Sequence, residues 1–326
     1  MRISFAEGLA KAIYESLAAD PRVVLIGSGF MGLNMVARKL MEPAVREFSD
    51  RMLVTPISEL ALAGAGIGAA VCGQRPVVDL GTGSFIYQAF AQVANEAANI
   101  HYMSGGQTNA PVTFYCLAGM RGMGAAQHSG RTQAMLGQVP GLQILTPGGA
   151  DDAYCLMKWA LLESKNPTVF ISHSLLFAET AEVVPGATML PLGKARIRRQ
   201  GRDISIIANS ITVPRALAAA DALEREHGVS AEVVDLRSIV PLDRESVLQS
   251  VAKTGRVVIA DECHRSFGVA AEIAATLAED GLAMLKAPVC RVAVPDVPIP
   301  FSQPLEDELT VTAKKIAAGV LKVLGR

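Results

Sequence analysis

The chain has 326 residues and a mass of 34.3 kDa, which is long for a single hydrophobic core and predicts two domains. Half of its residues are hydrophobic and only 19% are charged, a composition that excludes a disordered tail or scaffold. Thirty basic residues against 31 acidic residues give a formal net charge of −1, so nothing points to nucleic acid or an anionic membrane as a partner.

The first 170 residues alternate short apolar runs with longer helical patterns. Helix-length connections between near-continuous apolar strands are typical of a parallel α/β sheet that is covered on both faces. Ser4 precedes the first helical pattern, and Glu7 follows three residues later, which predicts a capping box. The predicted strands are Val23–Ile26, Met52–Val54, Pro76–Leu80, Val112–Leu117, Leu142–Leu145 and Thr168–Ile171, and the predicted helices span residues 4–18, 33–47, 58–72, 87–102, 128–137 and 150–164.

The alternation stops between His173 and Leu192, where Pro185, Gly186 and Pro191 interrupt the pattern. We interpret this stretch as an interdomain connection and expect domains of residues 1–190 and 191–326. A second α/β unit follows the connection. Its predicted strands are Asp203–Ala208, Ala231–Asp235, Arg256–Asp261 and Val289–Ala293, and its predicted helices span residues 212–226, 243–251, 267–278 and 307–324.

Five scattered cysteines form no CxxC pair, which favours buried thiols in a reducing compartment over a zinc site or disulfides. The first twenty residues carry acids and lack a long apolar run, so they resemble neither a signal peptide nor a transit peptide. No stretch approaches 18 consecutive apolar residues. We therefore expect a cytoplasmic protein.

Residues 27–32, with the sequence GSGFMG, match the pattern GxGxxG after a predicted strand. Such glycines let backbone amides approach the pyrophosphate of a dinucleotide, and Asp50 follows about 20 residues later. However, a helix precedes this strand, and Asp50 lies before the second strand instead of at its end. A nicotinamide site therefore remains an alternative beside a simple glycine-rich turn.

Residues 55–59, with the sequence TPISE, open a helix that is rich in alanine and glycine. Glu59 fits an ordinary first-turn carboxylate, which the helix dipole favours. The small residues that follow also predict close helix packing, which would bury Glu59 beside an interface. A carboxyl group there could share a proton with a ligand nitrogen.

A glycine-rich loop at residues 119–127 follows another predicted strand and leads to His128. Ligands of parallel α/β sheets bind outside the carboxyl ends of the strands, so this loop is a candidate for ligand binding. The alternative is that its glycine and methionine residues serve only turn geometry and packing. The sequence contains no GxSxG, P-loop or HExxH motif, and no histidine cluster indicates a metal site.

Seven stretches, taken together and in this order, resemble the β subunit of thiamine-diphosphate-dependent 2-oxo acid dehydrogenases of the pyruvate, branched-chain and acetoin types. The resemblance covers almost the whole chain. Its segments are TPISE at 55–59, QAFAQVANEAA at 88–98, YMSGGQ at 102–107, GAAQHS at 124–129, PGLQILTP at 140–147, LGKARIRRQG at 192–201 and EVVDLRSIVPLD at 232–243.

The family implies a transketolase-like α/β fold, with a pyrimidine-binding domain at residues 1–190 and a transketolase C-terminal-like domain at residues 191–326. Glu59 matches the glutamate that hydrogen-bonds the aminopyrimidine ring of the cofactor. Phe85 matches the aromatic side chain that stacks on this ring, and Gln88 lies in the same cofactor-binding segment. His128 matches an active-site histidine near the reacting carbon, suited to proton transfer or to orienting an acyl acceptor.

The resemblance also implies ions and a partner. In some members a structural potassium ion is held, mainly through carbonyl groups, at positions that match Val112, Ala160, Leu161, Glu163 and Asn166. The family's diphosphate and magnesium motif, GDG followed by a later asparagine, does not occur in this sequence. We therefore expect a separate α subunit that carries this motif and most of the Mg²⁺ ligands, an α2β2 assembly, and possible recruitment to a lipoyl acyltransferase core.

The chain departs from the family in two places. Ser28 stands where members commonly carry an acid, and Gly81–Ser84 replace the usual aromatic or acidic segment before Phe85. These changes predict a different substrate choice or site-to-site coupling. They also keep open a split transketolase or carboligase that passes a ketol group to an aldehyde. A dinucleotide oxidoreductase and a scaffold subunit without catalysis are further alternatives.

Overall fold

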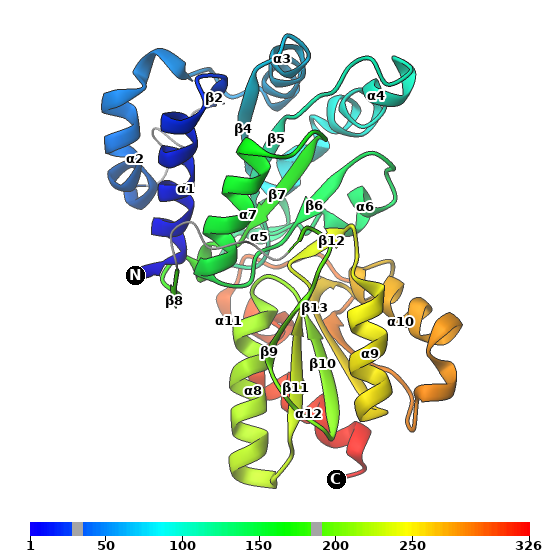
Figure 1. Cartoon of the computed structure of the whole chain (residues 1–326). Coiled ribbons are helices and arrows are strands. Elements are labelled where there is room, and N and C mark those ends of the chain that lie inside the picture. Colours follow the sequence, from blue (N-terminus) through cyan, green and yellow to red (C-terminus); the bar gives the residue numbers. More distant parts are fainter. Residues whose placement is uncertain (28–34, 184–190) are drawn as a thin grey trace. The chain divides into compact units, whose positions relative to one another are not determined.

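The computed structural model describes residues 1–27, 35–183 and 191–326. The chain folds into two compact units, which Figure 1 shows coloured along the sequence. The first unit contains Met1–Gly119 and, among the described residues, residues 127–183, so most of the predicted connection from His173 onward belongs to this unit and includes a short strand, Thr180–Glu182. The second unit contains the chain beyond the connection and also Met120–Ala126, although the sequence neighbours of this short segment belong to the first unit.

The first unit is built on a parallel sheet, as the apolar runs predict. Its strands lie in the order β6-β7-β5-β4-β2-β3, and every neighbouring pair is parallel, with Val77 of β4 opposite Thr113 of β5. The strands are β2 (Val23–Ile26), β3 (Met52–Leu53), β4 (Arg75–Thr82), β5 (Thr113–Leu117), β6 (Gln143–Leu145) and β7 (Thr168–Ser172).

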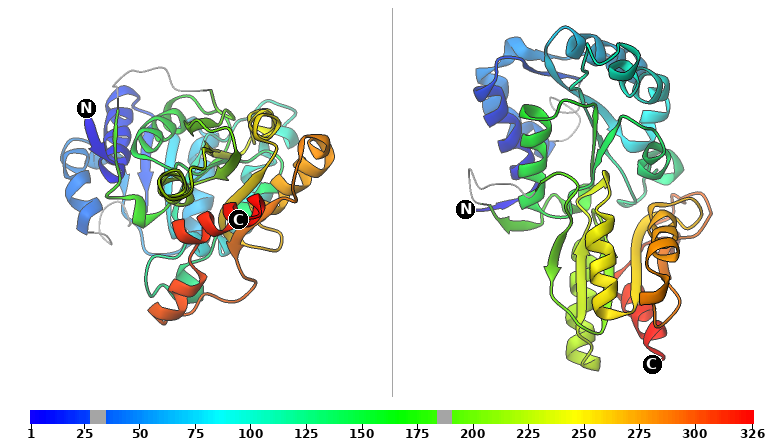
Figure 2. Two further views of the ribbon diagram at one scale, coloured as in Figure 1. Left: turned by 90° about the horizontal axis from the view of Figure 1, so that it is seen from below. Right: turned by 45° about the vertical axis from the view of Figure 1, so that its right-hand side comes forward.

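Helices cover both faces of this sheet (Figures 1 and 2). Helices α1 (Phe5–Ala19), α2 (Met35–Glu47) and α7 (Ala150–Leu162) pack together on one face. Helix α3 (Glu59–Val71) packs against β4 on the other face, beside a π-helical segment, Ala91–Ala97. Because both faces are covered, the strands need no polar alternation. The shorter elements are α4 (Ile100–Met103), α5 (Ala125–His128), α6 (Gln133–Gly137) and the antiparallel pair β1 (Arg2–Ser4) and β8 (Thr180–Glu182).

The predicted capping box is confirmed at the start of α1. The backbone N–H of Glu7 donates to the Ser4 hydroxyl at 3.2 Å, and the backbone N–H of Ser4 donates to the Glu7 carboxylate at 2.7 Å. Backbone N–H groups at a helix start have no partner within the helix. These two reciprocal hydrogen bonds satisfy them and therefore fix where the helix begins.

The second unit has a five-stranded sheet in the order β14-β13-β10-β11-β9, in which only β9 is antiparallel to its neighbour among the described strands. Helices α8 (Thr212–His227) and α12 (Ala313–Leu324) pack together on it, as do α9 (Arg244–Thr254) and α10 (Val269–Asp280), seen from another side in Figure 2. The remaining elements are β9 (Arg196–Arg199), β10 (Ile204–Ala208), β11 (Ala231–Asp235), β12 (Ser238–Val240), β13 (Val257–His264), β14 (Cys290–Val294) and α11 (Gln303–Leu309).

Three predicted helices are interrupted in the structure. The helix expected at 87–102 consists of a 3-10 helix (Gly83–Tyr87), the π-helical segment and α4, and the helix expected at 128–137 consists of α5 and α6. The helix expected at 307–324 is divided into α11 and α12 because the Thr312 side chain accepts the Lys315 N–H and begins a new helix. Across the described residues, no helix is both long and apolar enough to cross a membrane.

Candidate active site

The carboxyl ends of the parallel strands in the first unit bring three predicted site residues to one edge of the sheet. Glu59 follows β3, Phe85 follows β4 and His128 follows β5. Parallel strands end at the same edge, and ligands of open α/β sheets bind at that edge. The fold therefore places Glu59, Phe85 and His128 where a bound ligand belongs.

Glu59 is the first residue of α3, and its side chain is only 6% exposed. Its carboxylate has neither a hydrogen-bond nor an ion-pair partner among the described residues. The hydroxyl of Thr55, in the same segment, is also buried without a partner there. Buried polar groups are normally hydrogen-bonded, and the N-terminus of a helix favours a carboxylate. The segment is therefore prepared to receive a polar ligand.

Phe85 and His128 form an aromatic pair across two loops. Their ring centroids lie 5.2 Å apart in an edge-to-face arrangement at 70°. Phe85 is half-buried and His128 is exposed. The backbone N–H of Gly130 donates to the Ser84 hydroxyl at 3.1 Å, which ties the segment before Phe85 to the chain after His128. The half-buried Phe85 ring therefore forms an apolar surface, and the exposed His128 imidazole lies at the rim of this surface.

Two neighbouring residues complete this edge. Gln88 is exposed, and its backbone N–H donates to the Phe85 carbonyl at 3.0 Å. Asp79 is buried on β4, and it accepts the backbone N–H of Gly81 at 2.8 Å. Burial, together with the Asp79 charge, raises the pKa of the Cys116 thiol to about 12, so this thiol stays protonated and inert. We did not predict a role for Asp79, although an acid inside an apolar strand was a visible signal.

Residues 27–32 match the dinucleotide-binding pattern, and only Gly27 of this motif lies among the described residues. Gly27 has a φ of +126°, and a Cβ there would lie 3.0 Å from the side chain and carbonyl of Asp79, so only glycine fits. Gly29, Gly32 and the departure at Ser28 lie outside the described residues.

Four of the five carbonyl groups proposed for potassium, those of Val112, Ala160, Leu161 and Asn166, already accept a hydrogen bond, so a further cation would share them with these donors. The buried guanidinium of Arg75 donates to the carbonyls of Ala160, Leu161 and Ser164, the last at 2.7 Å. The Val112 carbonyl accepts the Thr168 N–H at 2.9 Å. The remaining candidates are the Asn166 carbonyl, which accepts hydroxyl groups of Ser164 and Thr168, and Glu163, whose side chain is exposed.

Arg75 thus supplies a positive charge from within the chain at the end of α7, where helix carbonyls lack partners. A second cation at the same carbonyls would face that charge at close range. The sequence signal for this arrangement was an arginine at the start of an apolar strand, which we passed over.

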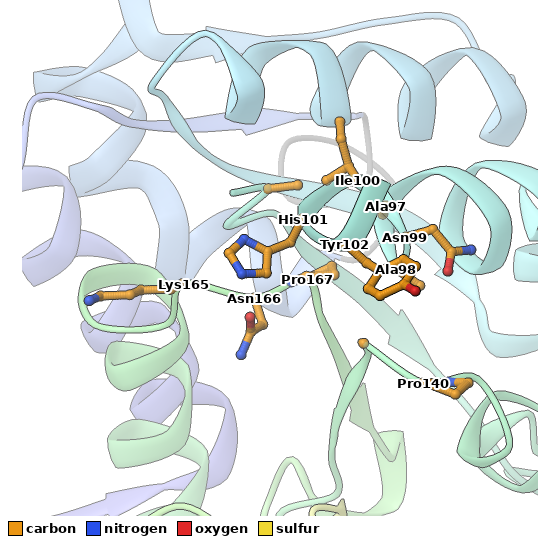
Figure 3. Close-up of a pocket in the computed structure, with 12 residues that line it drawn as sticks. Ala97, Ala98, Asn99, Ile100, His101, Tyr102, Pro140, Lys165, Asn166 and Pro167 are labelled. Atoms are coloured by element: carbon orange, nitrogen blue, oxygen red, sulfur yellow. The ribbon is translucent and has the colours of Figure 1, made fainter. Parts of the chain in front are cut away.

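A cavity of about 430 Å³ lies at the opposite, amino edge of the sheet (Figure 3). It is lined by Ala97–Tyr102, Ala110, Pro140, Gly141 and Lys165–Pro167. Figure 3 shows the His101 ring facing the Asn166 amide, while Lys165 is directed away from them. None of the predicted catalytic residues lines this cavity, so it is not part of the candidate active site.

Helix α3 has two different faces. On the inner face a Cβ at Gly66 would lie 2.3 Å from the Val78 side chain, so the helix packs closely against β4. On the other face Gly64 and Gly68 have nothing within 4 Å. Exposed apolar side chains occur on α3 and in the segment that precedes it, and they include Leu53, Val54, Ile57, Leu60 and Val71. Exposed apolar side chains that gather on a surface are typical of a protein interface.

Comparisons with known families and proteins agree with the α/β fold of the two units. The transketolase pyrimidine binding domain matches residues 1–178, and the transketolase C-terminal domain matches residues 193–316. The pyruvate dehydrogenase E1 component subunit beta-1 of rice mitochondria is 42% identical over 92% of this chain and 81% of the relative. The acetoin:2,6-dichlorophenolindophenol oxidoreductase subunit beta of Cupriavidus necator is 36% identical over 99% of this chain and 98% of the relative.

Among solved structures, a split gene transketolase in the form of an inactive beta4 tetramer resembles this chain with a TM-score of 0.80. It is 26% identical, and the match covers 99% of this chain and 98% of the other.

Proposed function

The chain belongs to the transketolase-like family of thiamine-diphosphate-dependent β subunits, and we propose that it forms half of an enzyme that acts on a 2-oxo acid or a related ketone. The enzyme decarboxylates or cleaves this substrate and transfers the acyl fragment to a lipoyl acceptor. The observation that carries the proposal is Glu59, a residue that is only 6% exposed and whose carboxylate has no partner within the described part of the chain.

The residues at the carboxyl edge of the first sheet suit the aminopyrimidine half of thiamine diphosphate. The Glu59 carboxyl group would share a proton with a ring nitrogen, and Phe85 and the segment around Gln88 would orient the ring. When bound, the cofactor supplies the electron sink that carbon–carbon cleavage needs. His128 stands at the rim, where it can hold or deliver a proton at the departing acyl group.

A partner subunit is needed for the other half of the cofactor. The sequence has no GDG motif for the diphosphate and Mg²⁺, so we assign these to an α subunit in an α2β2 assembly. The outer face of α3, with open space at Gly64 and Gly68, supports such an interface next to Glu59. An acyltransferase core as a further partner, and a cytoplasmic location, remain predictions of the sequence.

The identities favour a dehydrogenase-type β subunit over the split transketolase alternative. The two dehydrogenase-type relatives are 42% and 36% identical to this chain, whereas the split transketolase is 26% identical. An assay that offers the assembled enzyme a lipoyl acceptor or an aldehyde acceptor separates the two functions.

The first test is a native pull-down of this chain, identification of its partner, and an assay of bound thiamine diphosphate. We expect a GDG-bearing partner and about one cofactor per αβ pair. A homodimer without thiamine diphosphate would contradict the proposal. Tight binding of NAD(H) by that homodimer would favour the dinucleotide alternative instead.

A further inference from the structure

Two short segments of the first unit are in direct contact beside the candidate active site. Gly83 and Ser84 come immediately before Phe85, and Gly130 follows His128 by two positions. All five residues belong to the first unit. A Cβ at Gly83 would lie only 3.1 Å from the carbonyl oxygen of Gly130. A glycine at position 83 therefore allows the two segments to approach this closely.

The contact between Ser84 and Gly130 is both polar and steric. The backbone N–H of Gly130 donates to the Ser84 hydroxyl at 3.1 Å. A Cβ at Gly130 would collide with this hydroxyl oxygen, and its three nearest heavy atoms would all belong to Ser84. Gly130 does not have a positive φ, so its backbone conformation does not require glycine. The close approach of Ser84 is therefore what excludes a side chain at position 130.

This contact lies next to the edge-to-face pair of Phe85 and His128, whose ring centroids are 5.2 Å apart. The His128 imidazole is exposed and forms no hydrogen bond with the residues that the structure describes. A single edge-to-face contact stabilises a ring only weakly. The position of His128 therefore depends on its backbone, and Ser84 holds that backbone two residues further along.

We propose that Ser84 is a positioning residue for His128. Its hydroxyl binds the Gly130 amide, its side chain occupies the space that a Cβ at position 130 would need, and both contacts fix the chain after His128 relative to Phe85. This inference rests on the proposed function in one respect, namely that His128 serves the reacting acyl group. Ser84 acts through the backbone and takes no part in the proton transfer.

The polar contact is tested with Ser84→Ala, and Ser104→Ala is the matched control. The Ser104 hydroxyl accepts the backbone N–H of Thr108 at 3.0 Å, so each variant loses the same kind of hydrogen bond. In the assembled complex we expect Ser84→Ala to lower kcat about 10-fold, because small misplacements of a catalytic group have effects of this size. Ser104→Ala should leave kcat within about 2-fold. The affinity of both variants for thiamine diphosphate should also stay within about 2-fold.

The steric contact is tested with a double variant. Gly130→Ala places a Cβ against Ser84 and should lower kcat by up to about 100-fold. Gly137→Ala is its control, because a Cβ there meets nothing within 4 Å. In Ser84→Gly/Gly130→Ala the colliding side-chain atoms of Ser84 are absent. Its kcat should therefore return to about that of Ser84→Gly alone.

Two readouts on the full chain do not depend on activity. The chain has five histidines, so labelling with ¹³C at Cε1 gives five NMR signals, and the signal that His128→Asn removes belongs to His128. The ring current of Phe85 should displace this signal, and Ser84→Ala should move it toward its position in Phe85→Leu, whereas Ser104→Ala should not. Hydrogen exchange of the Gly130 amide should be slow in the wild type and faster in Ser84→Ala.

Several outcomes would overturn the inference. Rapid exchange of the Gly130 amide in the wild type would do so even if the variants fail to fold. A His128 signal that neither Ser84→Ala nor Gly130→Ala moves would also do so, as would equal losses of kcat in Ser84→Ala and Ser104→Ala. Losses that multiply in the double variant would show that positions 84 and 130 act independently, against the proposal.

The same measurements separate this inference from the proposed function. If the wild-type complex neither binds thiamine diphosphate nor acts on a 2-oxo acid, the proposed function fails. The His128 signal and the exchange of the Gly130 amide still decide whether Ser84 positions His128.

Discussion

Polar groups at the two edges of the first sheet differ in whether they have hydrogen-bond partners within the chain. At the amino edge the Arg75 guanidinium donates to three carbonyl groups, and the hydroxyls of Ser164 and Thr168 form hydrogen bonds with each other and with Gln143. At the carboxyl edge Glu59 is a buried residue whose carboxylate has no partner among the described residues, and His128 is exposed.

Under the proposed function, this difference separates residues that stabilise the fold from residues that bind the cofactor and substrate. A satisfied buried group contributes to the free energy of unfolding, and its removal leaves its partners unsatisfied. An unsatisfied buried group destabilises the free chain and gains its partner only on binding. The comparison therefore predicts that substitutions at the two edges affect different measurements.

The largest effect is expected at Glu59. Glu59→Gln should lower the activity of the assembled enzyme about 10²- to 10⁴-fold, because it removes a positioned proton donor and acceptor. The free energy of unfolding of the chain should change by less than about 0.5 kcal/mol or increase, because no internal partner is lost. Steady-state kinetics and urea unfolding measure the two quantities.

The control for Glu59 is Glu163→Gln, which changes an exposed acid at the amino edge and should leave both quantities unchanged. Unchanged activity of the complex with Glu59→Gln would instead support the scaffold alternative, in which this chain takes no part in catalysis.

At Arg75 we expect a substitution to lower the stability of the chain, in contrast to Glu59, where we expect it to lower activity. Arg75→Met should lower the free energy of unfolding by about 3 kcal/mol, because buried carbonyl groups at the end of α7 lose their donor. Arg22→Met, which removes an exposed ion pair with Asp20, should have a much smaller effect on the free energy of unfolding. Urea unfolding of the two variants makes the comparison.

We expect the same guanidinium to make the stability of the chain independent of potassium. Exchanging KCl for NaCl at constant ionic strength should shift the wild-type Tm by less than about 1 °C, because Arg75 already serves these carbonyls. A saturable rise of several degrees with K⁺ would show that the ion binds beside Arg75 and would restore the site that the family resemblance implied.

The inner and outer faces of helix α3 provide a second comparison within a single element. Gly66→Ala places a Cβ against Val78 and should lower the free energy of unfolding by about 1–3 kcal/mol. Gly64→Ala meets nothing within the chain and should raise it by up to about 1 kcal/mol, because alanine favours helix. Gly64→Leu should leave the chain folded and weaken its association with the α subunit, as measured by analytical ultracentrifugation. Unchanged association would place the partner interface elsewhere.

Local sequence patterns accounted for most of this architecture. The apolar runs predicted the six parallel strands of the first unit, and the Ser4–Glu7 spacing predicted the capping box. Parallel topology alone made the glycine-rich loop after β5 a candidate for ligand binding, whereas Glu59, Phe85 and His128 were assigned together only through the family resemblance. The strands, the capping box and this loop are encoded within a few residues or follow from parallel topology, so a single sequence reveals them.

Contacts between distant segments could not be predicted in the same way. The guanidinium of Arg75 reaches Leu161 and Ser164, and Glu306 reaches Gly122, across 86, 89 and 184 positions of the sequence. The β1–β8 pair joins strands of three residues each, too short and too polar to give a periodic signal. Such contacts depend on packing, which local propensity does not encode.

The smallest effect is expected at a polar cluster that lies between helices instead of at either edge. Glu15 on α1 accepts hydrogen bonds from Tyr154 at 2.5 Å and from Lys158 at 2.6 Å on α7. Partial burial works to raise the pKa of Glu15, but the hydrogen bonds from Lys158, Tyr154 and Lys11 outweigh it and lower the pKa to about 2. The carboxylate is therefore more acidic in the folded chain than in the unfolded chain.

A group whose pKa is depressed by folding contributes stability above its unfolded value, near 4.5, and loses it as the pH falls toward about 2. Because the Glu15 side chain is still 26% exposed, solvent screening reduces this contribution to about 1 kcal/mol. Glu15→Gln should lower the urea midpoint at pH 7 and have little effect near pH 2. Glu42→Gln, an exposed acid on α2, should change neither midpoint. A Glu15→Gln variant that matched the wild type at pH 7 would mean that solvent screening removes the whole contribution, and satisfied polar groups would then stabilise this chain only where they are buried.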